Sequence, residues 1–284
     1  MRALLATILS CALFATSLSA QELQGTLKQI QDSGIFRIGY RHSQPPMSFL
    51  SNDDVPGGYS IDICHYISKR VESEIGRDVT IEYIPVTAEE RFEALAANKI
   101  DILCGSTTVT FTRRELVDFT QLTFVTGGSY LTLKGRDIRN NFDGKKLGVV
   151  KGTTTAVALK KLFQETETKV DIVLLESTDK GFDALKKGEI DILSADQVVL
   201  IGLISQADNP GEFALLPDMF SYEPFALAVR KNDADFRLVA DRAISHLYKS
   251  NEIKAVYDRW FGQFAPKMPS ALQALIKLNI IADE

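Results

Sequence analysis

A group of hydroxyl residues beside a glycine is the part of this sequence best suited to binding chemistry. The segment 104–108, CGSTT, follows a short apolar stretch, and Arg113 comes shortly after it. The glycine permits close approach to the backbone, Ser106 and Thr108 offer hydroxyl donors, and Arg113 can hold a carboxylate with two parallel hydrogen bonds. The pattern predicts an anion-binding turn, and its structural alternative is a turn whose Ser and Thr side chains cap a helix.

A second hydroxyl-rich turn, KGTTT at 151–155, stands between a predicted strand and a predicted helix. Unpaired N–H groups at the start of a helix favour an anion. Nucleotide-phosphate loops need the pattern GxxxxGK[ST], but Gly144-Lys145-Lys146 lacks the upstream glycine and the hydroxyl residue. The two turns, one in each half of the chain, therefore predict a carboxylate clamped between two lobes.

Alternating strands and helices must position these turns. Strand-like and helix-like periodicities alternate in both halves of the chain. The predicted strands are 36–40, 79–84, 100–104, 146–150, 170–175 and 190–193, and the predicted helices are 61–74, 88–97, 154–165 and 179–187. A β-α-β-α-β order requires parallel strands joined by crossover helices. The predicted fold class is therefore α/β, with two lobes that are each a mostly parallel sheet flanked by helices.

Two extended segments, 123–130 and 220–229, connect the halves. Gly127 and Gly128 interrupt the first and can absorb a dihedral change at a hinge, although a plain turn is the alternative. We expect a discontinuous first lobe from 21–125 and 224–284, and a second lobe from 126–223 that includes the hinge strands. Terminal helices are predicted over 236–250 and 252–261 with Trp260 buried, and the tail after Pro266 has no predicted place.

The first twenty residues have the order of a secretory signal. Arg2 supplies a positive charge, an uncharged apolar run covers 3–15, and small residues lead to Ala20. The run is shorter than the roughly 20 residues of a spanning helix. A lipoprotein signal ending at Cys11 would leave a very short apolar core. We therefore expect export to the periplasm, with cleavage near Ala20.

Composition and spacing exclude several classes of function. The net charge of −5 offers no basic face for nucleic acid and opposes an acidic ligand at long range, so anion selectivity must be local. His42, His65 and His246 stand apart from acids and cysteines at metal-ligand spacing. Ser106 lacks evident His and Asp partners for hydrolase chemistry. We expect no metal site, no cofactor and no enzymatic activity.

Two cysteines, Cys64 and Cys104, remain once the first twenty residues are removed. In an oxidising compartment they can form one disulfide. Alternatively, they are two buried thiols that pack as small apolar side chains. Spacing along the sequence does not decide between these alternatives.

The chain resembles the family 3 extracellular solute-binding proteins, which are the polar amino acid receptors of bacterial ABC importers. The matching motifs span nearly all of residues 30–262: PMSF at 46–49, GYSID at 58–62, DFT at 118–120, KGTT at 151–154 and the late Trp260. Within that family, CGSTT at 104–108 and YR at 40–41 are most similar to the glutamate/aspartate receptors. The resemblance implies the two-lobed, type II periplasmic binding protein architecture, in which two crossing strands join the lobes.

The resemblance also implies roles for individual residues. Ser106, Thr108 and Arg113 match first-lobe groups that hold the ligand's α-carboxylate, and Thr154 matches the second-lobe contact. Asp196 matches the acid that pairs with the α-ammonium group, and Phe49 matches an aromatic residue that lines the cleft.

Arg41 and Arg91 match arginines that hold a side-chain carboxylate. Arg41 also follows a predicted strand directly, at the end expected to face the cleft, whereas Arg91 lies early in an amphipathic helix, where arginine more often faces water. Ala88 stands where the acidic-ligand receptors usually have Ser, and Lys180 stands near the place of a usual His. Lys180 is expected either to replace that His as a donor or to point to solvent.

The implied mechanism is closure of two lobes over an L-amino acid, expected to be glutamate or aspartate, by a monomer that delivers it to the membrane permease of an ABC importer. Glutamine or another polar amino acid is an alternative ligand. A periplasmic enzyme of the same fold, such as a cyclohexadienyl dehydratase, is the alternative class.

Overall fold

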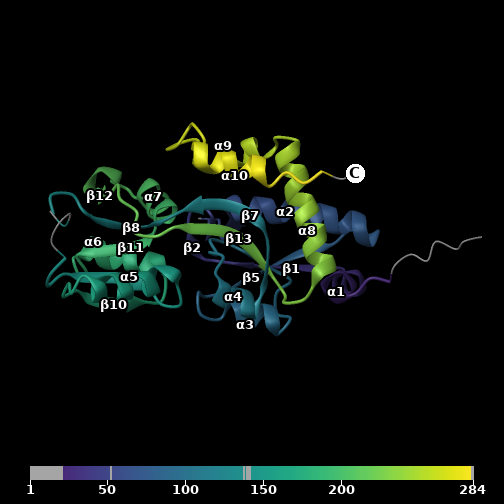
Figure 1. Cartoon of the computed structure of the whole chain (residues 1–284). Helices are drawn as coiled ribbons and strands as arrows, with labels where there is room; N and C mark the ends of the chain where they lie inside the picture. Colours follow the sequence, from purple (N-terminus) through teal and green to yellow (C-terminus); the bar gives the residue numbers. More distant parts are fainter. Residues whose placement is uncertain (1–21, 52, 137, 139–141, 283–284) are drawn as a thin grey trace, which may run out of the picture.

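The computed structural model describes residues 22–51, 53–136, 138 and 142–282. The predicted secretory signal and its cleavage near Ala20 lie outside these residues. Two separate sheets and their helices form two lobes, joined by long crossing strands (Figure 1). The predicted two-lobed α/β architecture is thereby confirmed.

The first lobe is built on a five-stranded sheet. Its order is β5 (Thr80–Pro85), β1 (Ile35–Tyr40), β6 (Ile102–Cys104), β13 (Glu223–Val229) and β7 (Asp118–Thr126). The first three strands are parallel, and β13 runs antiparallel to both of its neighbours. The helices of this lobe are α1 (Gly25–Ser33), α2 (Tyr59–Ile75), α3 (Arg91–Ala96), α4 (Phe111–Leu116), α8 (Ala234–Lys249), α9 (Ile253–Phe261) and α10 (Ser270–Leu278).

Helix α2 illustrates why these segments fold as they do. Its apolar residues recur every three or four positions, so Ile63, Ile67 and Val71 are fully buried on one face. The helix ends where Gly76 adopts φ 71°, a left-handed conformation that glycine reaches without a Cβ clash.

The second lobe repeats the pattern on a sheet of order β10 (Asp171–Leu175), β9 (Lys146–Val150), β11 (Ile192–Asp196), β8 (Gly128–Leu133) and β12 (Phe213–Leu215). Its helices are α5 (Thr154–Glu165), α6 (Thr178–Lys187), α7 (Gln197–Ser205) and the short 3-10 helix η1 (Pro210–Glu212). Strands β9, β10 and β11 are parallel, and β8 and β12 are antiparallel additions.

A small three-stranded sheet, β2 (Ser43–Gln44), β3 (Ser48–Leu50) and β4 (Pro56–Gly57), follows β1. It brings residues 43–50 to the edge of the first lobe, where β2 contacts α6 and α7 of the second lobe. No sequence pattern predicted these strands, because each has only two or three residues.

Strands β7 and β13 pair side by side between the lobes, and the predicted lobe boundaries fall within them (Figure 1). A Cβ atom on Gly127 would lie 2.2 Å from the carbonyl oxygen of Ser221, and one on Gly128 would lie 2.6 Å from the Phe220 ring. In this conformation the two glycines therefore permit the close approach of the two crossing segments. Neither is among the residues with positive φ.

Two local expectations need correction, and one segment without a predicted place can be assigned. The predicted helix 88–97 is helical only from Arg91 to Ala96, and residues 88–90 form a turn in which Thr87 and Glu90 exchange side-chain-to-backbone hydrogen bonds of 3.1 and 3.2 Å. Trp260 is half-buried rather than buried, and its Nε1–H donates to Asp62. The tail after Pro266 forms α10, which packs against β7.

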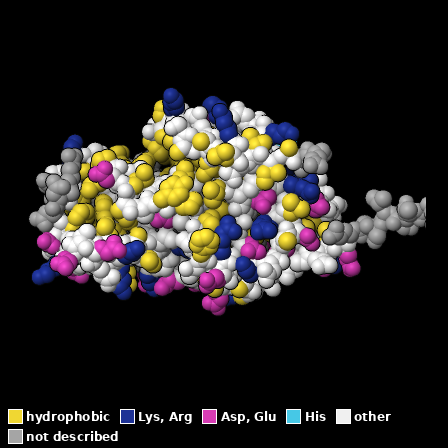
Figure 2. All heavy atoms as spheres, viewed as in Figure 1, with side chains coloured by type: hydrophobic (Ala, Val, Ile, Leu, Met, Phe, Trp, Pro, Cys, Tyr) yellow, Lys and Arg dark blue, Asp and Glu magenta, His cyan; other side chains and the backbone are white. Residues whose placement is uncertain are grey.

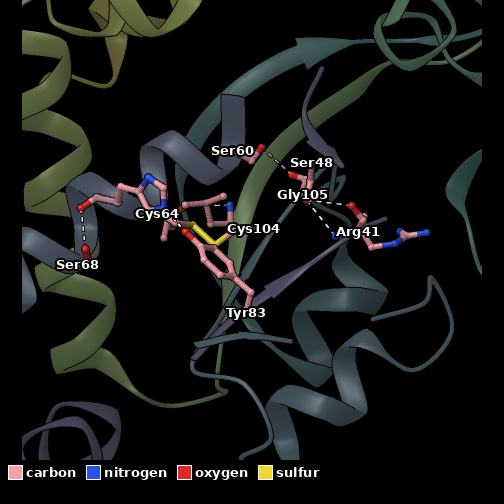
Figure 3. Close-up of a disulfide and its surroundings, with 11 residues drawn as sticks. Arg41, Ser48, Ser60, Cys64, Ser68, Tyr83, Cys104 and Gly105 are labelled. Atoms are coloured by element: carbon pink, nitrogen blue, oxygen red, sulfur yellow. Dashed lines mark hydrogen bonds between the residues drawn. A yellow bond between two sulfur atoms is a disulfide. The ribbon is translucent and has the colours of Figure 1, made fainter. Parts of the chain in front are cut away.

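Cys64 on α2 and Cys104 at the end of β6 form a disulfide, with their Cα atoms 6.5 Å apart (Figure 3). Both residues are fully buried. The alternative of two free thiols is therefore wrong. The disulfide fixes α2 to the strand that leads into the CGSTT turn.

The surface fits the modest negative charge of the chain. On the face in Figure 2, acidic and basic side chains are interspersed among the described residues, with apolar side chains between them. Within the described ranges, no helix is long and apolar enough to cross a membrane.

Candidate functional site

The two lobes meet face to face across the predicted site. Lys151 Nζ lies 2.8 Å from Glu89 Oε2, and the hydroxyl oxygens of Thr108 and Thr154 are 3.3 Å apart. A Cβ atom on Gly202 of α7 would lie 2.1 Å from the carbonyl oxygen of Pro45, so the lobes are in close contact there too. These contacts describe a closed conformation.

Three arginines from separate elements of the first lobe form what we call the arginine cluster: Arg41, Arg91 and Arg113. Arg41 directly follows β1, Arg91 begins α3, and Arg113 lies in α4. They are only 4%, 1% and 9% exposed, which is unusual because arginine is rarely buried without a partner. The guanidinium groups of Arg91 and Arg113 lie 4.8 and 5.5 Å from the centre of the Phe92 ring. These cation–π contacts help to fix the positions of the two guanidinium groups.

Burial makes the charges of the cluster costly. It lowers the pKa of Arg41 to about 10, and it lowers the pKa of Arg91 well below its usual value. The positive charges of Arg41 and Arg113 lower the pKa of Arg91 further. The arrangement therefore favours the arrival of an anion.

Two carboxylates face the cluster. Asp196 ends β11, and burial, with a further contribution from nearby Glu223, raises its pKa to about 7. Glu223 begins β13 and is only 2% exposed. Three guanidinium groups therefore share the cleft with two carboxylates. This leaves one positive charge in excess.

The hydroxyl turns lie where the strands end, as predicted. Ser106 donates to Gln44 Oε1 over 2.8 Å, and Arg113 Nη1 donates to the carbonyl oxygen of Thr108 over 2.8 Å. The helix caps are made by other residues, since Thr110 caps α4 and Thr153 caps α5. The capping alternative for Ser106 and Thr108 is therefore wrong.

Some polar atoms of the cleft are buried without a hydrogen-bond partner among the residues that the structure describes. They include two donors, Arg41 Nη1 and Arg91 Nε, and one acceptor, Asp196 Oδ1. Native proteins seldom leave such atoms unpaired. Two cationic donors match a carboxylate, and the acceptor matches an ammonium group.

Two predicted site residues lie apart from this cluster. Phe49 packs its ring edge-to-face on Trp260, with ring centroids 5.6 Å apart. Lys180 is exposed in the first turn of α6. Among the described residues neither makes a hydrogen bond, ion pair or ring contact with the arginines. Ala88, where the acidic-ligand receptors usually have Ser, is buried.

Sequence reasoning missed two residues of the cleft, Gln44 and Glu223. Glu223 carried a usable signal, since it is the only charged residue in the apolar segment EPFALAV. Gln44 carried none, because its contact with Ser106 joins residues 62 positions apart. In the part of the chain that the structure describes, no three His, Cys, Asp or Glu residues gather as metal ligands.

Two known proteins are similar to this chain over most of its length. The L-glutamate/L-aspartate-binding protein of Pseudomonas aeruginosa is 32% identical over 267 residues, covering 93% of this chain and 88% of that protein. The glutamate/aspartate import solute-binding protein of Escherichia coli K12 is 30% identical over 262 residues, covering 91% and 87%.

A solved ancestral amino acid-binding protein, AncCDT-1, described as a precursor of cyclohexadienyl dehydratase, has the same fold with a TM-score of 0.72. It is 24% identical and covers 84% of this chain and 100% of its own. Residues 36–263 match the model of one protein family. The chain therefore belongs to the bacterial extracellular solute-binding proteins, family 3, as its motifs predicted.

Proposed function

We propose that this protein is a receptor for an acidic L-amino acid, glutamate or aspartate, which it binds by closure of its two lobes. The observation that carries the proposal is the set of unpaired buried atoms: Arg41 Nη1 and Arg91 Nε as donors, and Asp196 Oδ1 as acceptor. A zwitterion with one additional carboxylate supplies a partner for each of these three atoms and offsets the excess positive charge of the cleft.

In this proposal Arg113, with the turn that carries Ser106 and Thr108, holds the α-carboxylate, together with the N-terminal turn of α5 at Thr154. The first N–H groups of a helix have no partner within the helix, and they favour an anion. Arg41 and Arg91 hold the side-chain carboxylate. Desolvated charge-assisted hydrogen bonds are worth roughly 1.5–3 kcal/mol each, enough to overcome the unfavourable net charge of the protein.

The proposed binding partner of this protein is inferred from the similar proteins. Because one similar protein is named an import solute-binding protein, we propose that this chain is a monomer exported through the signal at residues 1–20 and that it delivers its ligand to an ABC importer permease. Size-exclusion chromatography with light scattering, and mass spectrometry of the exported protein, test the monomer and the cleavage near Ala20.

We propose further that the protein is not an enzyme. The rival is a dehydratase acting on prephenate, for which an acid such as Asp196, with its pKa raised to about 7, could serve as proton donor. Prephenate also carries two carboxylates but has no ammonium group, so the unpaired acceptor Asp196 Oδ1 among the described residues favours an amino acid. Incubation of the purified protein with prephenate tests this proposal, and catalytic formation of an aromatic product would overturn it.

The main test is a calorimetric screen of the purified, signal-free protein against the common L-amino acids. We expect glutamate or aspartate to bind with a micromolar or tighter dissociation constant. Binding of glutamine alone would contradict the acidic ligand and assign the protein to neutral polar amino acids. No binding of any amino acid would refute the proposed function.

A further inference from the structure

Glu223 is a buried carboxylate to which neither the family motifs nor the proposed contacts assign a task. It lies at the start of the crossing strand β13. Both hydrogen bonds to its carboxylate come from hydroxyl groups: Ser221 donates to Oε1 over 2.7 Å, and Thr154 donates to Oε2 over 2.8 Å. Glu223 therefore connects the crossing strand to the first residue of α5 in the second lobe.

This connection fixes where the proton of the Thr154 hydroxyl points. A hydroxyl group has one proton and two acceptor sites, and an ionised carboxylate only accepts. Since Thr154 donates to Glu223, the contact of 3.3 Å between the Thr108 and Thr154 oxygens requires Thr108 to be the donor. The Thr154 oxygen then keeps one acceptor site and has no proton for a ligand carboxylate.

The Thr154 oxygen lies 2.8 Å from the Glu223 carboxylate, whose negative charge favours a cation beside it. Glu223 lies close enough to Asp196 to raise the pKa of Asp196, and the guanidinium groups of Arg113, Arg91 and Arg41 oppose that effect. Asp196 Oδ1 is itself buried without a hydrogen-bond partner in the described part of the chain. An ammonium group has only donors to offer, and two acceptors in the cleft match two of them.

We propose that Glu223 is a positioning residue for ligand selectivity. It holds the Thr154 hydroxyl as an acceptor, so that Thr154 and Asp196 together select the α-ammonium group. The inference rests on the proposed function and changes one expected role: the Thr154 side chain serves the ammonium group, while the backbone N–H groups at the start of α5 serve the α-carboxylate.

The test compares L-glutamate with glutarate, which keeps both carboxylates but lacks the ammonium group; L-aspartate and succinate form a second pair. Calorimetry gives the ratio of the two dissociation constants for the wild-type protein and for Glu223→Gln. We expect Glu223→Gln to reduce the preference for glutamate over glutarate about tenfold, the worth of a charge-assisted hydrogen bond. A role in folding alone would weaken both ligands equally and leave this ratio unchanged.

Two further variants make the test specific. Glu189→Gln removes the same charge from an exposed position of the second lobe and is expected to leave the ratio unchanged. In a Thr154→Val background, Glu223→Gln is expected to have a much smaller effect, because the residue through which it acts is gone.

The outcomes separate this inference from the proposed function. If the wild-type protein binds glutamate but Glu223→Gln leaves the ratio within about twofold of the wild-type value, well below the worth of one such bond, the inference alone is overturned. An undiminished effect in the Thr154→Val background overturns the route through Thr154. If the wild-type protein binds no amino acid, the proposed function falls, and the inference falls with it.

Discussion

The two sides of the cleft differ in the charge that they bury. The first lobe contributes the arginine cluster, three cations that are each at least nine-tenths buried, whereas the second contributes hydroxyl groups, the start of α5 and the carboxyl group of Asp196. Within the described residues, each side keeps buried polar atoms without a hydrogen-bond partner: donors of Arg41 and Arg91 on one side, and an acceptor of Asp196 on the other. Closure alone therefore does not complete the site, because the unpaired atoms on the two sides require a ligand that carries both kinds of charge.

The first lobe also carries the only disulfide within the described residues, and its loss is the largest effect that we predict. Replacing both cysteines, Cys64→Ala with Cys104→Ala, releases a link between residues 40 positions apart. The chain-entropy model gives a loss of about 4 kcal/mol in the free energy of unfolding.

Chemical denaturation measures this loss, with the unsubstituted protein under reducing conditions as a second comparison. If α2 and β6 are held together mainly by packing, the loss will be below about 1 kcal/mol, a typical value for one mutation. That result would contradict a stabilising role for the link.

Arg113 tests whether the first lobe supplies the contact common to all ligands. Arg113→Ala removes a buried cation and its hydrogen bond to the Thr108 carbonyl. We expect the affinity for every amino acid ligand to fall at least about 100-fold, as for one partner of a buried charge pair. Calorimetry measures this loss, and retention of glutamine binding by the variant would count against the assigned role.

Arg91 tests whether the cluster also sets selectivity. Arg91→Met keeps an apolar stem of similar length, and we expect it to reduce the preference for glutamate over glutamine by about tenfold or more. Thermal unfolding of the unliganded variant should show little loss of stability, because Arg91 is a desolvated cation that Arg41 and Arg113 repel. Equal weakening of glutamate and glutamine would remove Arg91 from the side-chain contact.

Lys180 gives the smallest effect, because it is exposed on the second lobe. Lys180→Ala should change the affinity for glutamate less than about threefold, within the range of an exposed charge. A tenfold or greater loss of glutamate affinity in the same titration would place Lys180 in the site. The second lobe would then also contribute a cation, as the first lobe does.

Local patterns were sufficient to predict much of this fold. Strand β9 and helix α5 have the predicted bounds, 146–150 and 154–165. Their apolar periodicity and the Thr153 cap depend only on residues that are close together in the sequence. The tail was harder to place. Helix α10 lies outside the repeated strand-helix pattern, and its packing against β7 joins distant parts of the chain.

The site likewise contains residues that local sequence predicted and residues that it did not. The turns at Ser106 and Thr154 were predicted from short motifs, and Arg41 from its position after a strand. Glu223 was not predicted, because its role depends on a hydrogen bond to a residue 69 positions away. Pairing of Cys64 with Cys104 likewise required the distance between α2 and β6, which the sequence does not give.

The central claim is that the cleft is built for a ligand with two carboxylates and one ammonium group. The most direct measurement is the pair of dissociation constants for L-glutamate and L-glutamine, titrated into the wild-type protein under identical conditions. We predict that glutamate, or aspartate against asparagine in a parallel titration, binds at least about tenfold more tightly than its amide. Equal affinities, or tighter binding of the amides, would contradict it.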